Sequence, residues 1–318
     1  MLKQLKDIYK KISLPLRIIV TLLLIFYIIS KLNYSLVLKI FSKASIPLLL
    51  VSFLMIFLSI VISAYKWKII LRKINKEVKY SKLLSLYLQG SFMNNLFPSN
   101  IGGDGYKYIK LKKIINSGKD SFASIFTDRF SGIIVLFAIS AISFIFLLIN
   151  FFDILYQKFL LHVWLASFIF GLLFLLLIIL LVFTSRFYKK FTNHKLGLLF
   201  DLRIILISLL FYLVSIINNY LISRAFGLNI PLIYFFMFIP LILLVITIPI
   251  SFNGLGLKEA SFIFLFGLLA ISNEQAFLMS FTGYLLLLAN SLLGGVLFLF
   301  KDSVSCSNKK LSIGHPLD

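Results

Sequence analysis

PSNIGGDGYK at residues 98–107 and PISFNGLGLK at residues 249–258 are two similar breaks in an otherwise apolar chain of 318 residues. Counted from each proline, glycine falls at the fifth and seventh following positions and lysine at the ninth. The two breaks are 151 residues apart, close to half of the chain length. Glycine and proline interrupt helices, so the pattern predicts one interrupted helical segment in each half of the chain.

The sequence around the breaks has the composition of a helical membrane protein. Hydrophobic residues make up 60% of the chain and charged residues 14%, and the mean hydropathy is +1.03. Soluble domains carry about 25% charged residues. Long apolar runs predict transmembrane helices, and six segments are long enough to span: 17–33, 45–65, 130–150, 162–184, 203–223 and 278–299. We therefore expect an all-α integral membrane protein without a soluble catalytic domain.

The arms of the two breaks are shorter than a membrane span. Residues 83–97, 232–248 and 260–271 would form helices about 22, 26 and 18 Å long, whereas the hydrocarbon core is about 30 Å thick. Irregular backbone at membrane depth is tolerated where protein or a water-filled cavity covers it. We therefore expect two re-entrant hairpins in addition to the six spans.

Three full spans lie between the hairpins, which inverts the second hairpin relative to the first. The first would enter from the cytoplasm and the second from outside, as in the inverted repeats of secondary transporters, whose interrupted segments mark a midplane binding site. Two alternatives remain open. In the first, the four matched positions arose by chance, because glycine and proline breaks are common in membrane helices. In the second, residues 232–249 and 259–272 are two complete spans, which gives eight helices.

One transmembrane domain is expected over residues 1–301, with repeat halves of about 14–150 and 160–300 and a polar cytoplasmic tail at 302–318. The formal charge of +21 is explained by loop orientation, so nucleic acid is not expected as a partner. Lysine and arginine near spans collect on the cytoplasmic side. One side holds 26 of the 32, in segments 1–17, 66–82, 106–129, 185–203 and 301–310. Both termini are therefore predicted in the cytoplasm, with the protein in the cell (inner or plasma) membrane.

The N-terminal segment resembles a signal peptide, with basic residues before an apolar stretch. Residues 30–33 lack a small-x-small cleavage site, so we interpret the segment as a retained first span.

The first break offers a phosphate site built from backbone and lysines. Glycines let backbone N–H groups approach a ligand, and a helix N-terminus favours anions. The candidate residues are Gly102, Gly103, Gly105, Lys107 and Lys110. In the alternative interpretation, Asp104 caps the helix and the lysines face water.

Two further charged pairs are candidates. Asp128 and Arg129 open the third span, either as an ordinary ion pair or with Arg129 as a phosphate contact. Lys258 and Glu259 follow Asn253, Gly254 and Gly256 in the second break. Ionisable residues inside a membrane region are costly, which favours a headgroup contact, although the pair could satisfy itself across one helical turn.

No motif for catalysis or for a cofactor is present in the sequence. The three histidines are scattered, and the single cysteine, Cys306, excludes a cysteine-based metal cluster. No P-loop, zinc motif or dinucleotide fingerprint occurs, so we assign no catalytic residue, metal or cofactor. Polar and small residues within the fifth and last spans are interpreted as helix-packing positions: Asn218, Asn219, Asn290, Ser291, Gly294 and Gly295.

Three motifs together resemble one family. NLFPSNIGGDGYK at 95–107 resembles the P-x-x-x-G-G-D-x-x-R element of the lysylphosphatidylglycerol synthase transmembrane region, also called the flippase-like family. The family's downstream D-R is similar to Asp128–Arg129, and its P-x-S-x-G-G-x-G-x-R-E element to residues 249–259. The resemblance covers about residues 10–300. Lys107 and Lys258 stand where the family usually has arginine, and Asn253 replaces a frequent glycine.

The resemblance implies a translocase that moves a phosphate-bearing lipid between leaflets, such as a lipid-linked glycan or an aminoacylated phospholipid. The family's soluble synthase domain is expected to be absent, because about 18 residues follow the last span. Two other functions stay open. One is a membrane-embedded transferase that uses Asp104, Asp128 or Glu259 as a base. The other is an anchor for a separate lipid- or glycan-modifying enzyme. The sequence leaves the oligomeric state open.

The expected topology can be tested by cysteine accessibility in cells after Cys306 is replaced. Single cysteines at Asn229 and Asn273 should react with an impermeant reagent from outside, and one at Ser117 should not. Cysteines in the two breaks should be shielded. Free labelling of the second break from the cytoplasm would instead indicate two complete spans in 232–272.

Overall fold

A computed structural model of the chain describes residues 19–96, 101–146, 149, 201–247, 251 and 254–311. These residues form helices and contain no strand, which confirms the all-α fold class. The helices in chain order are Ile19–Ser30, α2 (Tyr34–Ser42), α3 (Ile46–Lys73), α4 (Tyr80–Leu96), α5 (Ile101–Ile115), Gly118–Phe146, α7 (Leu202–Ala225), α8 (Leu232–Thr247), α9 (Leu257–Gly267) and α10 (Asn273–Leu311).

Several of these helices are long and apolar enough to cross a membrane. Four qualify in the described part of the chain, namely α3, Gly118–Phe146, α7 and residues 273–299 of α10. A fifth is added if Ile19–Ser30 and α2, bent by 86°, count as one span. The chain is therefore a multi-pass membrane protein. The expected span 162–184 lies outside the described residues, and the exact number of spans stays a prediction.

Two helices extend beyond the spans predicted from hydropathy. The helix α3 runs to Lys73 rather than ending near residue 65, and Gly118–Phe146 begins well before residue 130. Lys66, which the sequence placed in a cytoplasmic loop, is therefore inside a helix and buried. A hydropathy profile ends a predicted span at a lysine, because it contains no information about an ion-pair partner on another helix.

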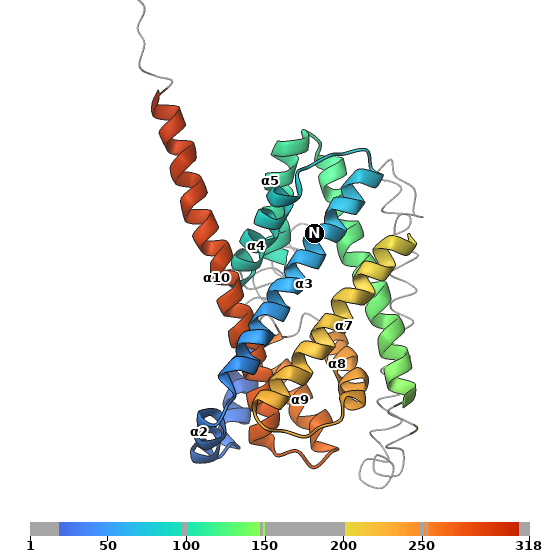
Figure 1. The fold of residues 1–318 in the computed structure, drawn as a ribbon, viewed down its shortest axis with the longest axis vertical. Coiled ribbons are helices and arrows are strands. Elements are labelled where there is room, and N and C mark those ends of the chain that lie inside the picture. Colours follow the sequence, from blue (N-terminus) through green and yellow to red (C-terminus); the bar gives the residue numbers. More distant parts are fainter. Residues whose placement is uncertain are drawn as a thin grey trace, which may run out of the picture.

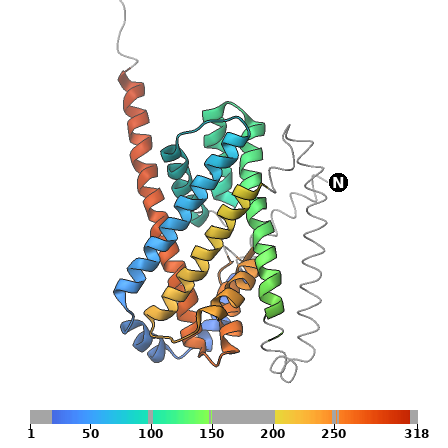
Figure 2. The same cartoon turned by 45° about the vertical axis from the view of Figure 1, so that its right-hand side comes forward.

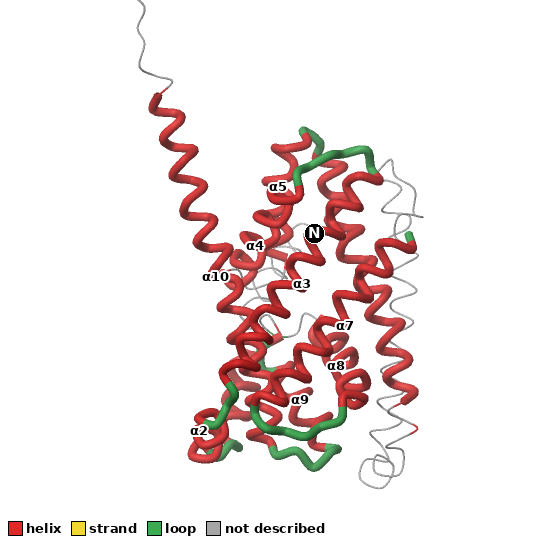
Figure 3. The backbone as a smooth tube through the Cα atoms, viewed as in Figure 1, coloured by secondary structure: helices red, strands yellow, loops and turns green. Residues whose placement is uncertain are grey.

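The two short helical pairs occupy opposite ends of the bundle. The helices α4 and α5 pack against each other, as do α8 and α9. Figure 1 shows the α4–α5 pair in the upper half and the α8–α9 pair in the lower half, and the turned view of Figure 2 agrees. The loops that the structure describes gather at the two ends of the bundle (Figure 3). This arrangement is compatible with two inverted hairpins, although the internal repeat itself stays a prediction.

The helices α3 and α7 form an antiparallel pair that is joined at both ends. At one end, Ser45 N donates to Ala225 O at 2.8 Å. At the other end, Lys73 donates to Asp201, which also caps α7 by accepting from Arg203 N at 3.1 Å. The hydrogen bond from Lys73 lowers the pKa of Asp201 below its ordinary value. The contribution of this pair to stability is therefore present above the unfolded-state pKa and is lost as the pH falls through the folded-state value.

The helix α8 contains an internal proline whose defect is repaired by a neighbour. Pro240 has no N–H, so the carbonyl of Phe236 loses its partner within the helix. Ser143 Oγ lies 2.9 Å from Phe236 O and shares its proton with Ile139 O at 2.8 Å. Ser140 donates to Pro240 O at 3.0 Å. The helix Gly118–Phe146 thereby satisfies backbone groups of α8 that lipid would leave unpaired.

The helix α4 is held between α5 and α10 by glycines. A Cβ on Gly103 would lie 2.2 Å from Gly90 O, and a Cβ on Gly294 would lie 1.9 Å from Leu88 O. These distances are too short for any side chain, so both contacts require glycine. The interpretation of Gly294 as a packing position is consistent with this contact.

Gly294→Ala should therefore separate α10 from α4 and lower the free energy of unfolding by about 2 kcal/mol, a typical cost of overpacking. The measurement is thermal or denaturant unfolding in detergent. Gly105→Ala is the matched control, because no atom lies within 4 Å of its added Cβ. That substitution should raise stability by about 1 kcal/mol through helix propensity. Equal effects of the two substitutions would contradict the packing role of Gly294.

Candidate functional site

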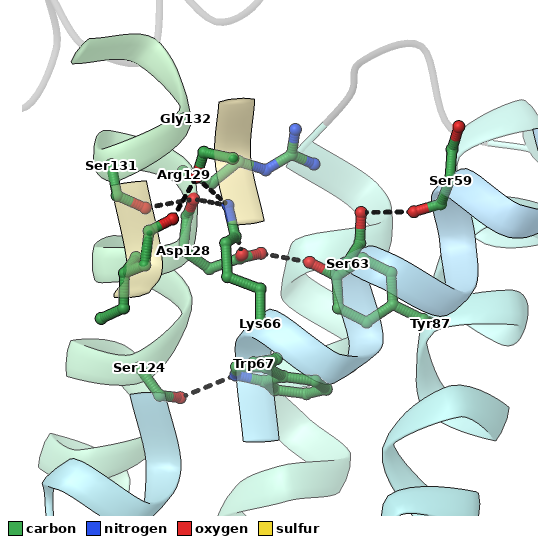
Figure 4. A network of polar contacts seen from close by, with 12 residues as sticks. Ser59, Ser63, Lys66, Trp67, Tyr87, Ser124, Asp128, Arg129, Ser131 and Gly132 are labelled. Atoms are coloured by element: carbon green, nitrogen blue, oxygen red, sulfur yellow. Dashed lines mark hydrogen bonds and ion pairs between the residues drawn. The ribbon is translucent and has the colours of Figure 1, made fainter. Parts of the chain in front are cut away.

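A buried ion pair joins α3 to the helix Gly118–Phe146. Lys66 Nζ lies 2.9 Å from Asp128 Oδ1, and the two side chains are 10% and 6% exposed. The same ammonium donates to Asp128 O at 2.8 Å and to Ser208 Oγ on α7 at 3.3 Å. Figure 4 shows the ammonium group of Lys66 directed at Asp128. A buried charge needs both an opposite charge and further hydrogen bonds, and Lys66 has both.

The second carboxylate oxygen of Asp128 is engaged by an aromatic group. Tyr87 on α4 donates its hydroxyl to Asp128 Oδ2. The ring of Tyr87 meets that of Trp67 edge-on at a centroid distance of 5.6 Å. Trp67, which is 1% exposed, donates to Ser124 Oγ at 3.1 Å. Asp128 therefore connects α3 and α4 to its own helix.

A second ion group lies next to the Tyr87 ring. Lys107 Nζ is 4.2 Å from the ring centroid of Tyr87 and 5.6 Å from that of Trp67. It also lies 2.8 Å from Asp104 Oδ1, and Arg129 Nε donates to Asp104 Oδ2 at 2.6 Å. The structure thus brings Asp104, Lys107, Asp128 and Arg129 together, four of the residues that the sequence selected from two separate motifs.

Among the residues that the structure describes, the charges of this cluster do not balance. Lys66, Lys107 and Arg129 supply three positive charges, and Asp104 and Asp128 supply two negative ones. The Arg129 side chain is 47% exposed, whereas that of Lys107 is 6% exposed. In Figure 4 the guanidinium group of Arg129 points away from the Lys66–Asp128 pair. The cluster therefore presents a cation at its accessible edge.

The glycines of the first break lie inside a helix. Gly102, Gly103 and Gly105 lie inside α5, which begins at Ile101 rather than after the glycines as expected. The N–H of Gly103 donates to Asn94 Oδ1 at 2.7 Å. The ammonium of Lys110 lies 5.5 Å from the ring centroid of Tyr106. The glycine at 103 serves helix contact, and its role toward a ligand stays a prediction.

The second break is organised by Glu259. Gly254 and Gly256 have φ angles of +76° and +79°, which favour glycine. The N–H of Gly256 donates to Glu259 Oε2 at 2.7 Å, the reciprocal bond of a helix capping box. Ser280 on α10 donates to Glu259 Oε1 at 3.1 Å. Both carboxylate oxygens of Glu259 are therefore engaged within the protein. Asn253 lies outside the described residues.

Lys258 has a different environment from Lys107. Its ammonium donates to Ser280 O at 3.3 Å and lies 5.8 Å from the ring centroid of Phe262. A Cβ on Gly283 would lie 3.4 Å from this ammonium, so the lysine occupies the room left by a glycine of α10. Among the described residues, no carboxylate forms an ion pair with Lys258.

Sequence reasoning missed Lys66, Tyr87 and Ser280. A signal for Lys66 was present: it lies four residues from Ile62 and from Ile70, on one helical face that is buried. Tyr87 and Ser280 carry no comparable signal, because a tyrosine or serine in an apolar helix is common. No group of three metal-ligating side chains occurs in the part of the chain that the structure describes.

Comparison with known proteins gives a family match over most of the chain. The model described as "Lysylphosphatidylglycerol synthase TM region" matches residues 15–294, which include both breaks. The chain is also 28% identical over 155 residues to UPF0104 membrane protein PH1989 of Pyrococcus horikoshii. That similarity covers 48% of this chain and 43% of the relative, so the match spans less than half of the relative's length.

Removing one member of the Lys66–Asp128 pair should be more harmful than removing both. Asp128→Asn leaves the buried ammonium without its counter-charge and should lower the free energy of unfolding by about 3 kcal/mol. The double variant Lys66→Met/Asp128→Asn should recover much of that loss. Unfolding of the wild type, both single variants and the double variant in detergent measures the coupling. Additive effects would show that the two side chains do not interact.

Proposed function

Because the chain belongs to the lysylphosphatidylglycerol synthase transmembrane region family, we propose that it moves a phosphate-bearing lipid between the leaflets of the cell membrane. The candidate substrates are a lipid-linked glycan and an aminoacylated phospholipid. The charge distribution of the spans favours both termini in the cytoplasm. In this orientation the α4–α5 pair enters from the cytoplasmic side and the α8–α9 pair from the outer side.

The observation that carries the proposal is excess positive charge among apolar helices. The cluster around Asp104 and Asp128 holds one more cation than carboxylate, and Lys258 has no carboxylate partner in the described part of the chain. Uncompensated charge is costly in a membrane region and marks a functional site. A lipid phosphate supplies the missing negative charge and accepts hydrogen bonds from Arg129 and Lys258.

The short helical pairs supply the geometry for such a ligand. Interrupted helices that enter from opposite faces expose their ends within the membrane, where transporters bind charged substrates. We propose that a headgroup passes between the two pairs while its acyl chains stay in lipid. Lysines at 107 and 258, in place of arginines, contact the phosphate as point charges and release it more readily than a bidentate group would.

The acidic residues fit a positioning role. Asp104 forms ion pairs with Lys107 and Arg129. Asp128 pairs with Lys66 and accepts a hydrogen bond from Tyr87. Glu259 accepts hydrogen bonds from Gly256 N and Ser280. A general base must reach the proton that it removes. Engagement of all three carboxylates within the protein therefore favours translocation over a transferase reaction.

Lipid movement can be measured with purified protein in liposomes that contain a fluorescent phosphatidylglycerol or polyprenyl phosphate and an impermeant quencher. The wild type should expose inner-leaflet lipid to the quencher. Arg129→Gln and Lys258→Gln should each slow this exposure by about tenfold or more, because a hydrogen bond to a charged group contributes about 1.5 kcal/mol or more.

Lys113→Gln is the charge-matched control. Lys113 is exposed on α5, so its substitution should leave the rate unchanged. Absence of movement of both lipids by a folded wild-type protein would reject the proposal. Equal loss of rate in all three variants would show that overall charge, rather than these two positions, matters.

A further inference from the structure

The short helix α2 does not run with the other helices. It follows Ile19–Ser30 after a bend of 86°. A helix nearly perpendicular to an apolar, span-like helix lies close to the membrane plane. Figure 1 shows α2 at the lower end of the bundle, beside the start of α3.

Both ends of α2 are fixed to helices that begin or end at this level. Before the helix, Asn33 N donates to Glu274 Oε1 at 3.2 Å, and Glu274 lies in the first turn of α10. After it, Ser45 N donates to Ala225 O, the last residue of α7, at 2.8 Å. The end of one span and the start of another mark a membrane boundary, so α2 is held at that boundary.

The surface of α2 is divided into three sides. Val37 and Ile40 are half-buried toward the protein. An outward apolar side consists of Tyr34, Leu38 and Phe41, which are 59%, 69% and 47% exposed and follow i, i+4, i+7 spacing. The remaining polar side consists of Ser35, Lys39, Ser42 and Lys43, all exposed.

The charge of this segment has one sign. Lys31, Lys39 and Lys43 are exposed, and residues 31–45 contain no acidic residue. An apolar side flanked by lysines is the pattern of a helix that lies in the membrane interface and attracts anionic headgroups. If α2 lay in water, four large apolar side chains would be exposed to it, namely Tyr34, Leu36, Leu38 and Phe41. A length of 9 residues is too short for a span.

We propose that α2 is an interfacial lipid-binding helix that is independent of the translocation site. Tyr34, Leu38 and Phe41 insert between the acyl chains of the nearer leaflet. Lys39 and Lys43 bind the phosphates of anionic phospholipids at its surface. The occupant of the apolar side is thus the lipid surface itself, rather than a second copy of the chain or a soluble protein.

Site-directed spin labels on a Cys306→Ser background test the placement of α2 in nanodiscs that contain phosphatidylglycerol. Labels at Leu38 and Phe41 should be accessible to oxygen and protected from a water-soluble nickel chelate. Labels at Ser35 and Ser42 should show the reverse. Full accessibility of Leu38 and Phe41 to the chelate would place α2 in water and overturn the proposal. Dipolar coupling between Leu38 labels on two chains would replace it with a dimer interface.

Lipid selectivity is tested with a bimane label at Ser42 and headgroup-quencher forms of phosphatidylglycerol and phosphatidylcholine. Quenching should favour phosphatidylglycerol about fivefold, and raising the salt concentration should reduce the preference. Lys39→Gln/Lys43→Gln should abolish it, whereas Lys113→Gln should not. An unchanged preference in the double variant would refute the lysine contacts. None of these readouts requires lipid translocation, so failure of the proposed function leaves them interpretable.

Discussion

The carboxylate of Asp128 is the contact on which the packing of the upper half in Figure 1 depends, because four helices meet at it or at its partner. Its own helix carries it, α3 supplies Lys66, α4 supplies the hydroxyl of Tyr87, and α7 reaches the same ammonium through Ser208. An unpaired charge between apolar helices is strongly disfavoured. Loss of either partner would leave such a charge, so the four helices are coupled through this contact.

From this pair, charge alternates outward through the cluster. Lys66 pairs with Asp128, which also accepts from the Tyr87 hydroxyl. Lys107 lies over the Tyr87 ring, and Asp104 joins Lys107 to Arg129. The series ends in an accessible cation. The second break has the same glycine and lysine spacing but different contacts. Glu259 caps its own helix, and Lys258 donates to the carbonyl of Ser280. Two similar sequences thus present positive charge through different local chemistry.

The sequence was sufficient for the helical class and for the choice of Asp104, Lys107, Asp128 and Arg129 as candidate residues. Hydropathy identifies apolar helices, and ionisable residues within an apolar region stand out as candidates. Asp128 and Arg129 were expected to open a span, but they lie inside the helix Gly118–Phe146. The sequence analysis placed Lys66 in a loop, because a lysine inside an apolar helix is recognised only when its distant partner is known. It also expected glycines to face a ligand at Gly103 and Gly256. At these positions another helix packs closely instead, because Gly90 O lies where a side chain of residue 103 would be and Leu24 lies where one of residue 256 would be. A glycine that makes room for a ligand cannot be distinguished in the sequence from a glycine that makes room for a neighbouring helix.

The contacts of the first helix also constrain how the protein is assembled during synthesis. Leu24 would collide with any side chain at Gly256, and Asn33 bonds to Glu274, which is 241 residues later in the chain. At ribosomal rates of about 5–20 residues per second, these partners emerge roughly 12–48 seconds apart. During that interval the N-terminal helix has already left the ribosome while its final neighbours are not yet made. Until then that surface faces lipid or other parts of the chain, and the contacts of the first helix are completed only when residues 256–274 have been made.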